Sequence, residues 1–490
     1  MLCADRLGNP THHRIALFFF QDSAPGGKRP YDTKMTRWLM KKIRSLSESS
    51  FLKLFFAFFS LAFLIAAVCM PDRAQMFTGL WKILSQPSKI SANYFAMGGF
   101  AATFLNMGLV GMLATLLFVA LKGKPNNVST LAVILTIGFG SWGINVLNMW
   151  FSILGVVVYG LVKKEKMGTL VNAMLFSTGI APLITDLLIR YPSAEVIGFN
   201  PLGFGLAIVV GLAIGFFLPA GLAHSPKVHL GFDLYSAALP IGMTAFLLNG
   251  ILYKTMGVSL PKALSDLEAA SMQVASQSIA NIFCLTLFGV CIVLAFLLGC
   301  KPKDYWNLLK DPDLVTNFSS TYGNAVFLMN VGVFGLFILG YYNLIGATFN
   351  GITFGIIFCM LSTCNSGSHP GNVWPIMLGY ALASVVFGWV APLLGGNFSY
   401  QINAQAICVG LCYANGLSPI ADKYGWRYGL VAAVLHYLLV TSVPNLHGGF
   451  CLYNGGFTAA LICMMMVPEL ERFFKTKQER KNRRLEKAAK

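Results

Sequence analysis

Charged residues are scarce in this sequence. Asp, Glu, Lys and Arg make up 11% of its 490 residues and hydrophobic residues make up 56%. Soluble globular proteins carry about 25% charged residues, which cover their surface. The composition therefore excludes an ordinary soluble protein, a disordered chain and a nucleic-acid-binding domain, and it predicts a protein that lies in a lipid bilayer.

The motifs of several enzyme classes are also missing. The 11 cysteines are too few and too scattered for a disulfide scaffold. There is no Gly-x4-Gly-Lys-Ser/Thr loop, which argues against an ATP-driven pump with its own motor, and no His-Glu-x-x-His zinc motif. Few carboxylates lie between the apolar segments, which disfavours a membrane hydrolase or glycosyltransferase. We therefore expect no enzymatic activity, no catalytic residues, no metal and no cofactor.

Long windows without charge define the apolar segments. About 20 apolar residues are needed to cross the hydrocarbon core as a helix. The windows predict fourteen segments, two of them within 125–162 and the others near 54–71, 90–121, 169–189, 201–223, 230–253, 275–299, 322–343, 351–366, 373–392, 402–420, 427–444 and 449–467.

The basic residues predict the orientation of these segments. The sequence has 36 Lys and Arg residues against 19 Asp and Glu, a formal charge of +17. With a cytoplasmic N-terminus, and with the pairs 127–162 and 351–392 returning to their own side, six basic residues fall outside and the other 30 of the 36 fall inside. The positive-inside rule then predicts that both termini are cytoplasmic, and the charge acts mainly as a topology signal.

The two ends of the chain differ from the apolar region. Residues 1–34 are polar and unlike a targeting peptide, so translation is expected to start at Met35, and the first span is expected to be a retained anchor. Residues 71–91 mix apolar and charged residues, which predicts a short helix on the outer surface. The basic tail from Arg472 is expected to contact anionic lipid head groups.

The chain contains an internal repeat with an offset of 224 residues, so that Asn93 aligns with Asn317 and Asn148 with Asn372. Further matches without a gap involve Gly, Asn and Trp, which apolar composition alone does not supply. A second block aligns Pro226–Tyr235 with Pro444–Tyr453 at six of ten positions. Between the blocks, Gly179–Asp186 resembles Gly416–Asp422 with a one-residue slip that aligns the two Asp residues.

The repeat predicts an all-α polytopic membrane protein with two inverted-topology repeats of about six segments, each with a short hairpin pair. The copies are displaced by seven segments, an odd number, so they are expected to lie upside down relative to each other, as in many secondary transporters. The expected domains are a basic N-terminal segment (1–50), an anchor with its outer segment (51–92), repeat A (93–253), a linker with one span (254–316), repeat B (317–467) and a basic tail (468–490).

The candidate binding site is the polar break in each hairpin pair. Non-helical backbone at membrane depth is tolerated only where protein buries it or water reaches it. The candidate solute ligands are Asn145, Asn148, Trp150, Asn365, His369, Asn372 and Trp374, and the hairpin glycines are Gly143, Gly155, Gly367 and Gly379. Two alternatives stay open: the Asn residues only satisfy the broken backbone, and the Trp residues are packing wedges or interface anchors.

A few ionisable residues inside the apolar region are candidates for ion coupling, because a charge in lipid is costly. Asp233 follows His229, and a desolvated carboxylate beside an imidazole suits proton coupling. Asp186, Asp422 and His447 are further candidates. The alternatives are that the two carboxylates of the Gly–Asp segments meet water at the membrane edge and that the histidines cap helices.

The chain resembles an uncharacterised bacterial family of multi-pass membrane proteins, a domain of unknown function, through His369–Pro375, Gly416–Asp422 and His447–Gly456. It is also faintly similar to urea channels, which are inverted duplications with Asn-Pro and Tyr-Asn-Gly segments, through Asn200–Gly203 and Tyr453–Gly455. The first copy departs from that pattern with Tyr235–Ala237. The first resemblance implies no activity, and the second keeps a channel for small neutral solutes in view.

The expected function is membrane transport. The leading hypothesis is a bacterial inner-membrane secondary transporter for a small polar solute, with proton or sodium coupling and a homo-oligomeric state left open. The alternatives are a passive channel of the same architecture and a membrane scaffold or lipid-handling enzyme.

Overall fold

The computed structural model describes residues 38, 41–87, 89–261, 273–310 and 316–488. The N-terminal prediction for residues 1–34 and Met35 lies outside this range. The chain divides into Met1–Ser45 and a second compact unit, Leu46–Lys490. In the first, Lys42 Nζ lies 5.0 Å from the centre of the Trp38 ring.

The regular elements of the described residues are helical. The first part of the unit contains α2 (Glu48–Cys69), α3 (Met76–Leu84), α4 (Tyr94–Gly98), α5 (Phe100–Ala120), α6 (Asn127–Phe139), α7 (Met149–Lys163), α8 (Val171–Ser177), α9 (Ala181–Ile189), α10 (Pro201–His229) and α11 (Ala238–Asn249), with short 3-10 turns η1 (Arg73–Gln75), η2 (Met167–Thr169) and η3 (Thr178–Ile180) and a π-helical turn, η4 (Gly250–Thr255).

The second part contains α13 (Gln277–Leu297), α14 (Pro302–Leu308), α15 (Phe318–Thr321), α16 (Asn324–Leu344), α17 (Gly351–Leu361), α18 (Pro370–Leu393), α19 (Gln405–Ala414), α20 (Ser418–Tyr424), α21 (Trp426–Val440), α22 (Val443–Leu446), α23 (Asn454–Phe473) and α24 (Lys477–Ala488), with 3-10 turns η5 (Ser362–Asn365) and η6 (Asn415–Leu417).

The prediction of an all-α polytopic membrane protein is confirmed. Seven described helices are long and apolar enough to cross a membrane: α2, α5, the α8–α9 pair, α10, α13, α16 and α18. Each of the fourteen predicted segments corresponds to helical structure. One expectation was wrong: α18, predicted as a short arm, has 24 residues, because the helix continues past its Pro375 and Pro392. Its counterpart α7 has 15 residues.

The residues before α4 and α15 show why the same local structure forms twice. Asn93 accepts a hydrogen bond from the Phe95 N–H, and Asn317 accepts one from the Ser320 N–H, so each Asn starts a short helix. Gly99 and Gly323 then have φ values of 90° and 88°, a conformation that favours glycine. Each copy therefore turns sharply into its long helix, α5 or α16.

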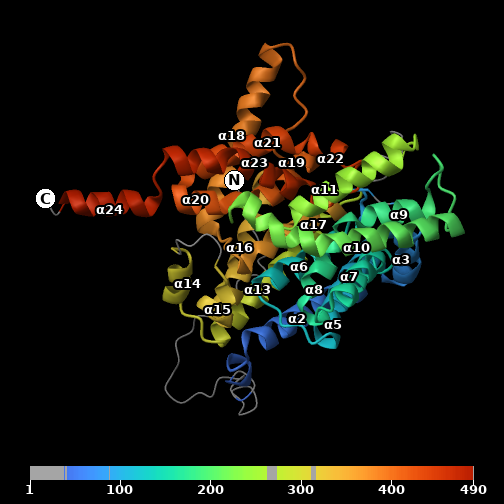
Figure 1. The fold of residues 1–490 in the computed structure, drawn as a ribbon. Helices are drawn as coiled ribbons and strands as arrows, with labels where there is room; N and C mark the ends of the chain where they lie inside the picture. The colour runs from blue at the N-terminus through green and yellow to red at the C-terminus, as the bar shows by residue number, and fades with distance from the viewer. Residues whose placement is uncertain (1–37, 39–40, 88, 262–272, 311–315, 489–490) are drawn as a thin grey trace, which may run out of the picture. The chain divides into compact units, whose positions relative to one another are not determined.

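The outer helices α2 and α13 occupy corresponding positions, since each packs against the first long helix of one copy, α5 or α16. A Cβ atom on Gly108 would lie 2.6 Å from Leu64 of α2, and one on Gly332 would lie 2.8 Å from the Phe288 carbonyl of α13. Glycines therefore let α2 lie close along α5, and α13 along α16 (Figure 1). The linking span is thus the counterpart of the N-terminal span, so each copy contains one more helix than the sequence predicted.

The helices α6 and α17 cross at the centre of the two copies. A Cβ on Gly138 of α6 would lie 2.8 Å from the Gly355 carbonyl of α17, so both positions need glycine. At one end of α6, Thr130 Oγ1 accepts a hydrogen bond from Asn365, which follows α17. At the other end, a Cβ on Gly351, the first residue of α17, would lie 2.7 Å from the Ser141 carbonyl. The two helices therefore pack antiparallel.

The short helix predicted in 71–91 is α3. It packs against α5 through its buried Gly79 and Ile83, while Phe77 and Trp81 are exposed. Exposed aromatic residues of this kind are typical of the level of the lipid head groups.

Candidate functional site

Two buried asparagines hold the polar breaks that follow α6 and α17. The Asn106 amide donates to the Gly140 and Ile144 carbonyls at 2.7 and 2.8 Å. Asn330, its partner in the repeat, donates to the Cys364 and Ser368 carbonyls at 2.8 and 3.0 Å. These four carbonyls are left without helical partners where the helices end, so each Asn satisfies two of them.

The predicted ligands in the two breaks make the same hydrogen bonds. Asn148 Oδ1 accepts from the Asn145 N–H at 2.9 Å, and Asn148 Nδ2 donates to the Gly143 carbonyl at 2.9 Å. Their partners His369, Asn372 and Gly367 repeat this arrangement at 3.0 and 2.8 Å in the same order. His369 Nδ1 also accepts from the Gly371 N–H at 3.1 Å. The offset of 224 residues thus predicts individual contacts.

The predicted alignment of Asp186 with Asp422 was wrong. Asn148 Nδ2 donates to Thr185 Oγ1 at 2.9 Å, and Asn372 Nδ2 donates to Asp422 Oδ2 at 2.5 Å. Thr185 and Asp422 lie three residues after Pro182 and Pro419, so no slip is needed. The two copies therefore correspond at the residue that accepts the hydrogen bond from the Asn side chain, and either a hydroxyl or a carboxylate can accept it.

Both breaks are closed in this structure. Asn145, Asn148, Asn365, His369 and Asn372 are at most 2% exposed. Asn365 donates to Thr130 and Ser319 and accepts from the Ser319 N–H at 2.8 Å. These contacts are those expected of residues that satisfy a broken backbone, and solute binding by them stays a prediction.

The two predicted Trp residues differ in their exposure, and two of the predicted hairpin glycines lie at contacts between helices. Trp150 is half-buried and donates to the Val146 carbonyl at 2.9 Å, whereas Trp374 is 40% exposed and lies against Trp426. Gly155 packs against α10, and its partner Gly379 packs against α21. The two Trp positions therefore lie at the packed periphery of α7 and α18, as the alternative of packing wedges or anchors expects.

A central seam joins the two copies through exchanged hydrogen bonds. The Leu234 N–H donates to the Gly416 carbonyl at 3.1 Å, and the Leu452 N–H donates to the Gly179 carbonyl at 2.9 Å. Leu234 and Leu452 are repeat partners, and so are the two glycines. A Cβ on Gly416 would lie 2.7 Å from the Tyr235 ring, so the seam has no room for a larger residue.

Asp233 lies in this seam and is 2% exposed. Its Oδ1 accepts from the Tyr235 N–H at 2.9 Å, while Oδ2 has no hydrogen-bond partner among the described residues. His229 Nδ1 accepts from the Asp233 N–H at 3.3 Å, and its Nε2 lies 2.8 Å from Ser236 Oγ. A backbone N–H only donates, so this imidazole is neutral with its proton on Nε2. His229 is therefore not a cation partner of Asp233.

Two more buried oxygens without partners flank Gly416 in the part of the chain that is described: Asn415 Oδ1 and Ser418 Oγ. The Asn415 amide donates to Thr363 Oγ1 at 2.7 Å, which fixes its orientation. The corresponding residues of the other copy are Cys451, Thr178 and Ala181, in place of Asp233, Asn415 and Ser418. One side of the seam thus carries a carboxylate, an amide and a hydroxyl, whereas the other side carries a thiol, a hydroxyl and a methyl group at the same positions.

Asp186 is neutralised within the protein. It is fully buried and forms a bidentate pair with Arg190 at 2.7 and 2.8 Å, and the Tyr253 hydroxyl donates to it at 2.5 Å. Nearby, Lys89 donates to the Pro261 carbonyl at 2.8 Å. Burial lowers the pKa of Lys89, while Asp186 raises it and Arg190 lowers it. The alternative that Asp186 meets water at the membrane edge was wrong, because Arg190 folds back onto it within one helical turn, and a coupling role for Asp186 stays a prediction.

His447 is fully buried and lies against Phe457. Neither of its ring nitrogens has a hydrogen-bond partner among the described residues, so its side chain does not cap a helix. Its backbone N–H donates to the Pro444 carbonyl at 3.2 Å, where His447 ends α22. A Cβ on the next residue, Gly448, would lie 2.6 Å from Asn249 Oδ1, which also lacks a described partner.

The sequence reasoning missed several buried polar residues. The Tyr235 hydroxyl donates to the Cys359 and Cys412 carbonyls at 2.9 and 3.2 Å. His436 lies between the Tyr380 hydroxyl at 2.6 Å and the Gly455 carbonyl at 2.8 Å. Tyr235 was visible as a repeat match with Tyr453, whereas a lone histidine in an apolar helix gave no signal.

A protein family described as "Protein of unknown function (DUF1576)" matches residues 72–254 and 301–472, which include both copies. No curated protein and no solved structure matches the chain.

Proposed function

This chain belongs to the DUF1576 family, and we propose that it is a secondary transporter that moves a small polar solute across a bacterial inner membrane, with both termini in the cytoplasm. In this proposal the two copies form inverted repeats that alternate in opening to each side.

The antiparallel packing of α6 and α17 is the observation that carries the proposal. These helices are repeat partners, as their matching capping boxes at Asn126 and Asn350 indicate. A two-fold axis that relates antiparallel helices is perpendicular to both of them. Since apolar helices run mainly along the membrane normal, the axis lies in the membrane plane. The copies are then inverted, in agreement with the odd displacement and the distribution of Lys and Arg.

The closed breaks suit two alternating gates. Because α6 and α17 run in opposite directions, the break at 140–148 and the break at 362–369 lie at opposite ends of the pair. About 13 residues of helix separate the ends of α6, a distance of about 20 Å. Opening one break while the other stays closed would give the solute access from one side at a time.

Asp233 is the proposed coupling residue. An ionised carboxylate buried without a cation costs several kcal/mol. Asp233 makes no ion pair among the described residues, and its neighbour His229 is neutral. Lys423, the basic residue of α20, lies over the Phe232 ring and pairs with Glu471 at 3.8 Å. Asp233 is therefore suited to take up a proton or sodium ion, with Asn415 and Ser418 as further oxygen ligands.

The test uses the purified full chain in proteoliposomes. A thermal-shift screen against metabolites identifies a solute that stabilises the protein, and uptake of that solute is then measured with and without imposed proton and sodium gradients. We expect uptake above the gradient-free level with one of the two ions. Uptake that ignores both gradients would establish the passive channel instead, and no uptake of any stabilising solute would contradict transport.

A further inference from the structure

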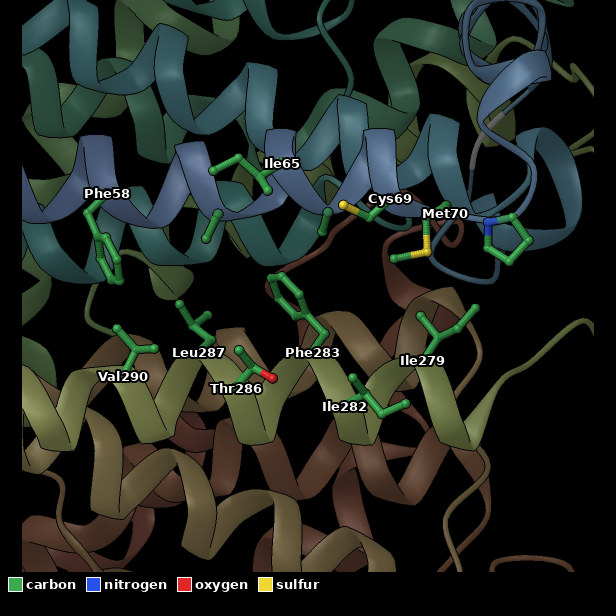
Figure 2. A pocket seen from close by; sticks show the side chains of 13 residues that line it. Phe58, Ile65, Cys69, Met70, Ile279, Ile282, Phe283, Thr286, Leu287 and Val290 are labelled. Atoms are coloured by element: carbon green, nitrogen blue, oxygen red, sulfur yellow. The ribbon is translucent and has the colours of Figure 1, made fainter. Parts of the chain in front are cut away.

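An apolar groove lies between α2 and α13, outside the seam that joins the two copies. Its volume is about 470 Å³, and Figure 2 shows Phe58 projecting from α2 toward α13, with Phe283 and Leu287 projecting from α13 toward α2. The other lining residues are apolar except for Thr286, and they run from Phe58 to Pro71 on α2 and its C-terminal turn and from Ile279 to Val290 on α13. An aqueous solute would find almost no hydrogen-bond partner there.

One end of the groove lies beside residues of the kinds found at the level of the lipid head groups. Cys69, Met70 and Pro71 line its end, and the chain then turns into η1 and the amphipathic helix α3, where Phe77 is exposed. Arg73, also exposed, follows two residues after Pro71. Aromatic and basic side chains are characteristic of the interface between lipid and water.

The length of the groove corresponds to one leaflet. From Phe58 to Cys69 the lining residues are 11 steps apart along α2, which is a rise of about 16 Å. The hydrocarbon core is about 30 Å thick, so half of it is about 15 Å. On α13 the groove ends at Val290, before the last turns of the helix.

Aromatic packing closes the groove on the protein side. The rings of Phe63 and Phe283 are 4.7 Å apart, and Phe63 also lies 5.0 Å from Phe358 of α17. On the other side, Ile65 and Ile282 are 55% and 67% exposed, in a chain whose helices are apolar enough to lie in lipid. The groove is thus a cleft that aromatic side chains close toward the protein and that opens toward the hydrocarbon.

We propose that this groove binds one acyl chain of a phospholipid from the leaflet at the Cys69 end, with Arg73 beside its head group. In the topology proposed above this is the outer leaflet, but the binding site itself does not depend on transport. Because α2 and α13 are the matching outer helices of the two copies, the bound chain fills the gap between them.

The test is photo-crosslinking of the full chain in nanodiscs that contain a phospholipid with a diazirine on its acyl chain, followed by mass-spectrometric mapping. We expect crosslinks concentrated on the peptides of α2 and α13. The variant Ala62→Trp places a ring in the groove and should lose them, whereas Leu61→Trp, at a neighbouring exposed position outside the lining, should keep them.

Three results would overturn the proposal. Crosslinks spread equally over α10, whose Val209 and Phe217 are exposed, would indicate bulk lipid only. Crosslinks unchanged by Ala62→Trp would place the lipid elsewhere. A crosslink between the Cys69 residues of two protein chains, together with loss of labelling by the lipid probe, would assign the groove to a second molecule of this protein. Gel filtration checks that each variant folds, and Ala66→Leu replaces Ala62→Trp if the larger substitution does not.

Discussion

The two copies share their backbone scaffold and differ in where they carry acids. In the first break Asn148 donates to Thr185, whereas in the second break Asn372 donates to Asp422. In the seam the positions are reversed, since Asp233 lies in the first copy and its counterpart is Cys451. Asparagine and glycine are kept where a backbone break or a close approach needs them. The acids differ between the copies, and in the proposed transporter this is where the two halves are unequal.

The largest effect is expected at the crossing that both copies share. A Cβ at Gly355 would lie 2.3 Å from Ser141 Oγ and 2.5 Å from the Gly138 carbonyl, so Gly355→Val should prevent the two copies from packing. We expect no monodisperse protein in gel filtration. The matched control is Gly340→Ala, since no atom lies within 4 Å of a Cβ there. Folded Gly355→Val protein would contradict the close crossing.

The second prediction concerns the acid in the seam. Asp233→Asn keeps an acceptor for the Tyr235 N–H but cannot carry a charge, so gradient-driven uptake should be lost while the thermal midpoint is unchanged or higher. Uptake in proteoliposomes and melting in detergent measure the two effects. Glu469→Gln, at an exposed position of α23, is the control and should leave both unchanged. Coupled uptake by the Asn variant would remove Asp233 from the mechanism.

The third prediction tests whether the two breaks are equally important for stability. Asn106→Ala and Asn330→Ala each leave two buried carbonyls without a donor, which costs about 2–4 kcal/mol in either copy. We expect similar losses of thermal midpoint for the two variants. A large difference would show that one break is held by other contacts and that the copies are not mechanically equivalent.

The smallest effect is expected from exchanging the acceptors between the copies. Asp422→Thr gives the second break the hydroxyl that Thr185 provides in the first, so Asn372 keeps an acceptor. The stability cost should be about 1 kcal/mol. Asp422→Leu removes the acceptor and should cost more in the same melting assay. Equal effects of the two substitutions would mean that the hydrogen bond to Asn372 contributes little.

The sequence predicted the membrane character, the apolar segments and the repeat, since each depends on composition or on residue spacing along the chain. The offset of 224 residues even predicted contacts, because the same asparagine at the same distance from a helix end meets the same carbonyls. It could not identify α13 as the counterpart of α2. Their similarity lies in how they pack on Gly108 and Gly332, and apolar helices of any sequence can do this.

The pairing of acids was decided by the tertiary structure. From the sequence, Asp186 and Asp422 looked equivalent. In the fold, Asp186 pairs with Arg190, one helical turn away, and Asp422 accepts a hydrogen bond from Asn372, fifty residues away. Asp233 receives no cation from the described residues. Spacing along a chain determines which residues lie on a helix and where the helix breaks, whereas the partner of a buried charge depends on contacts between distant helices, which only packing brings together.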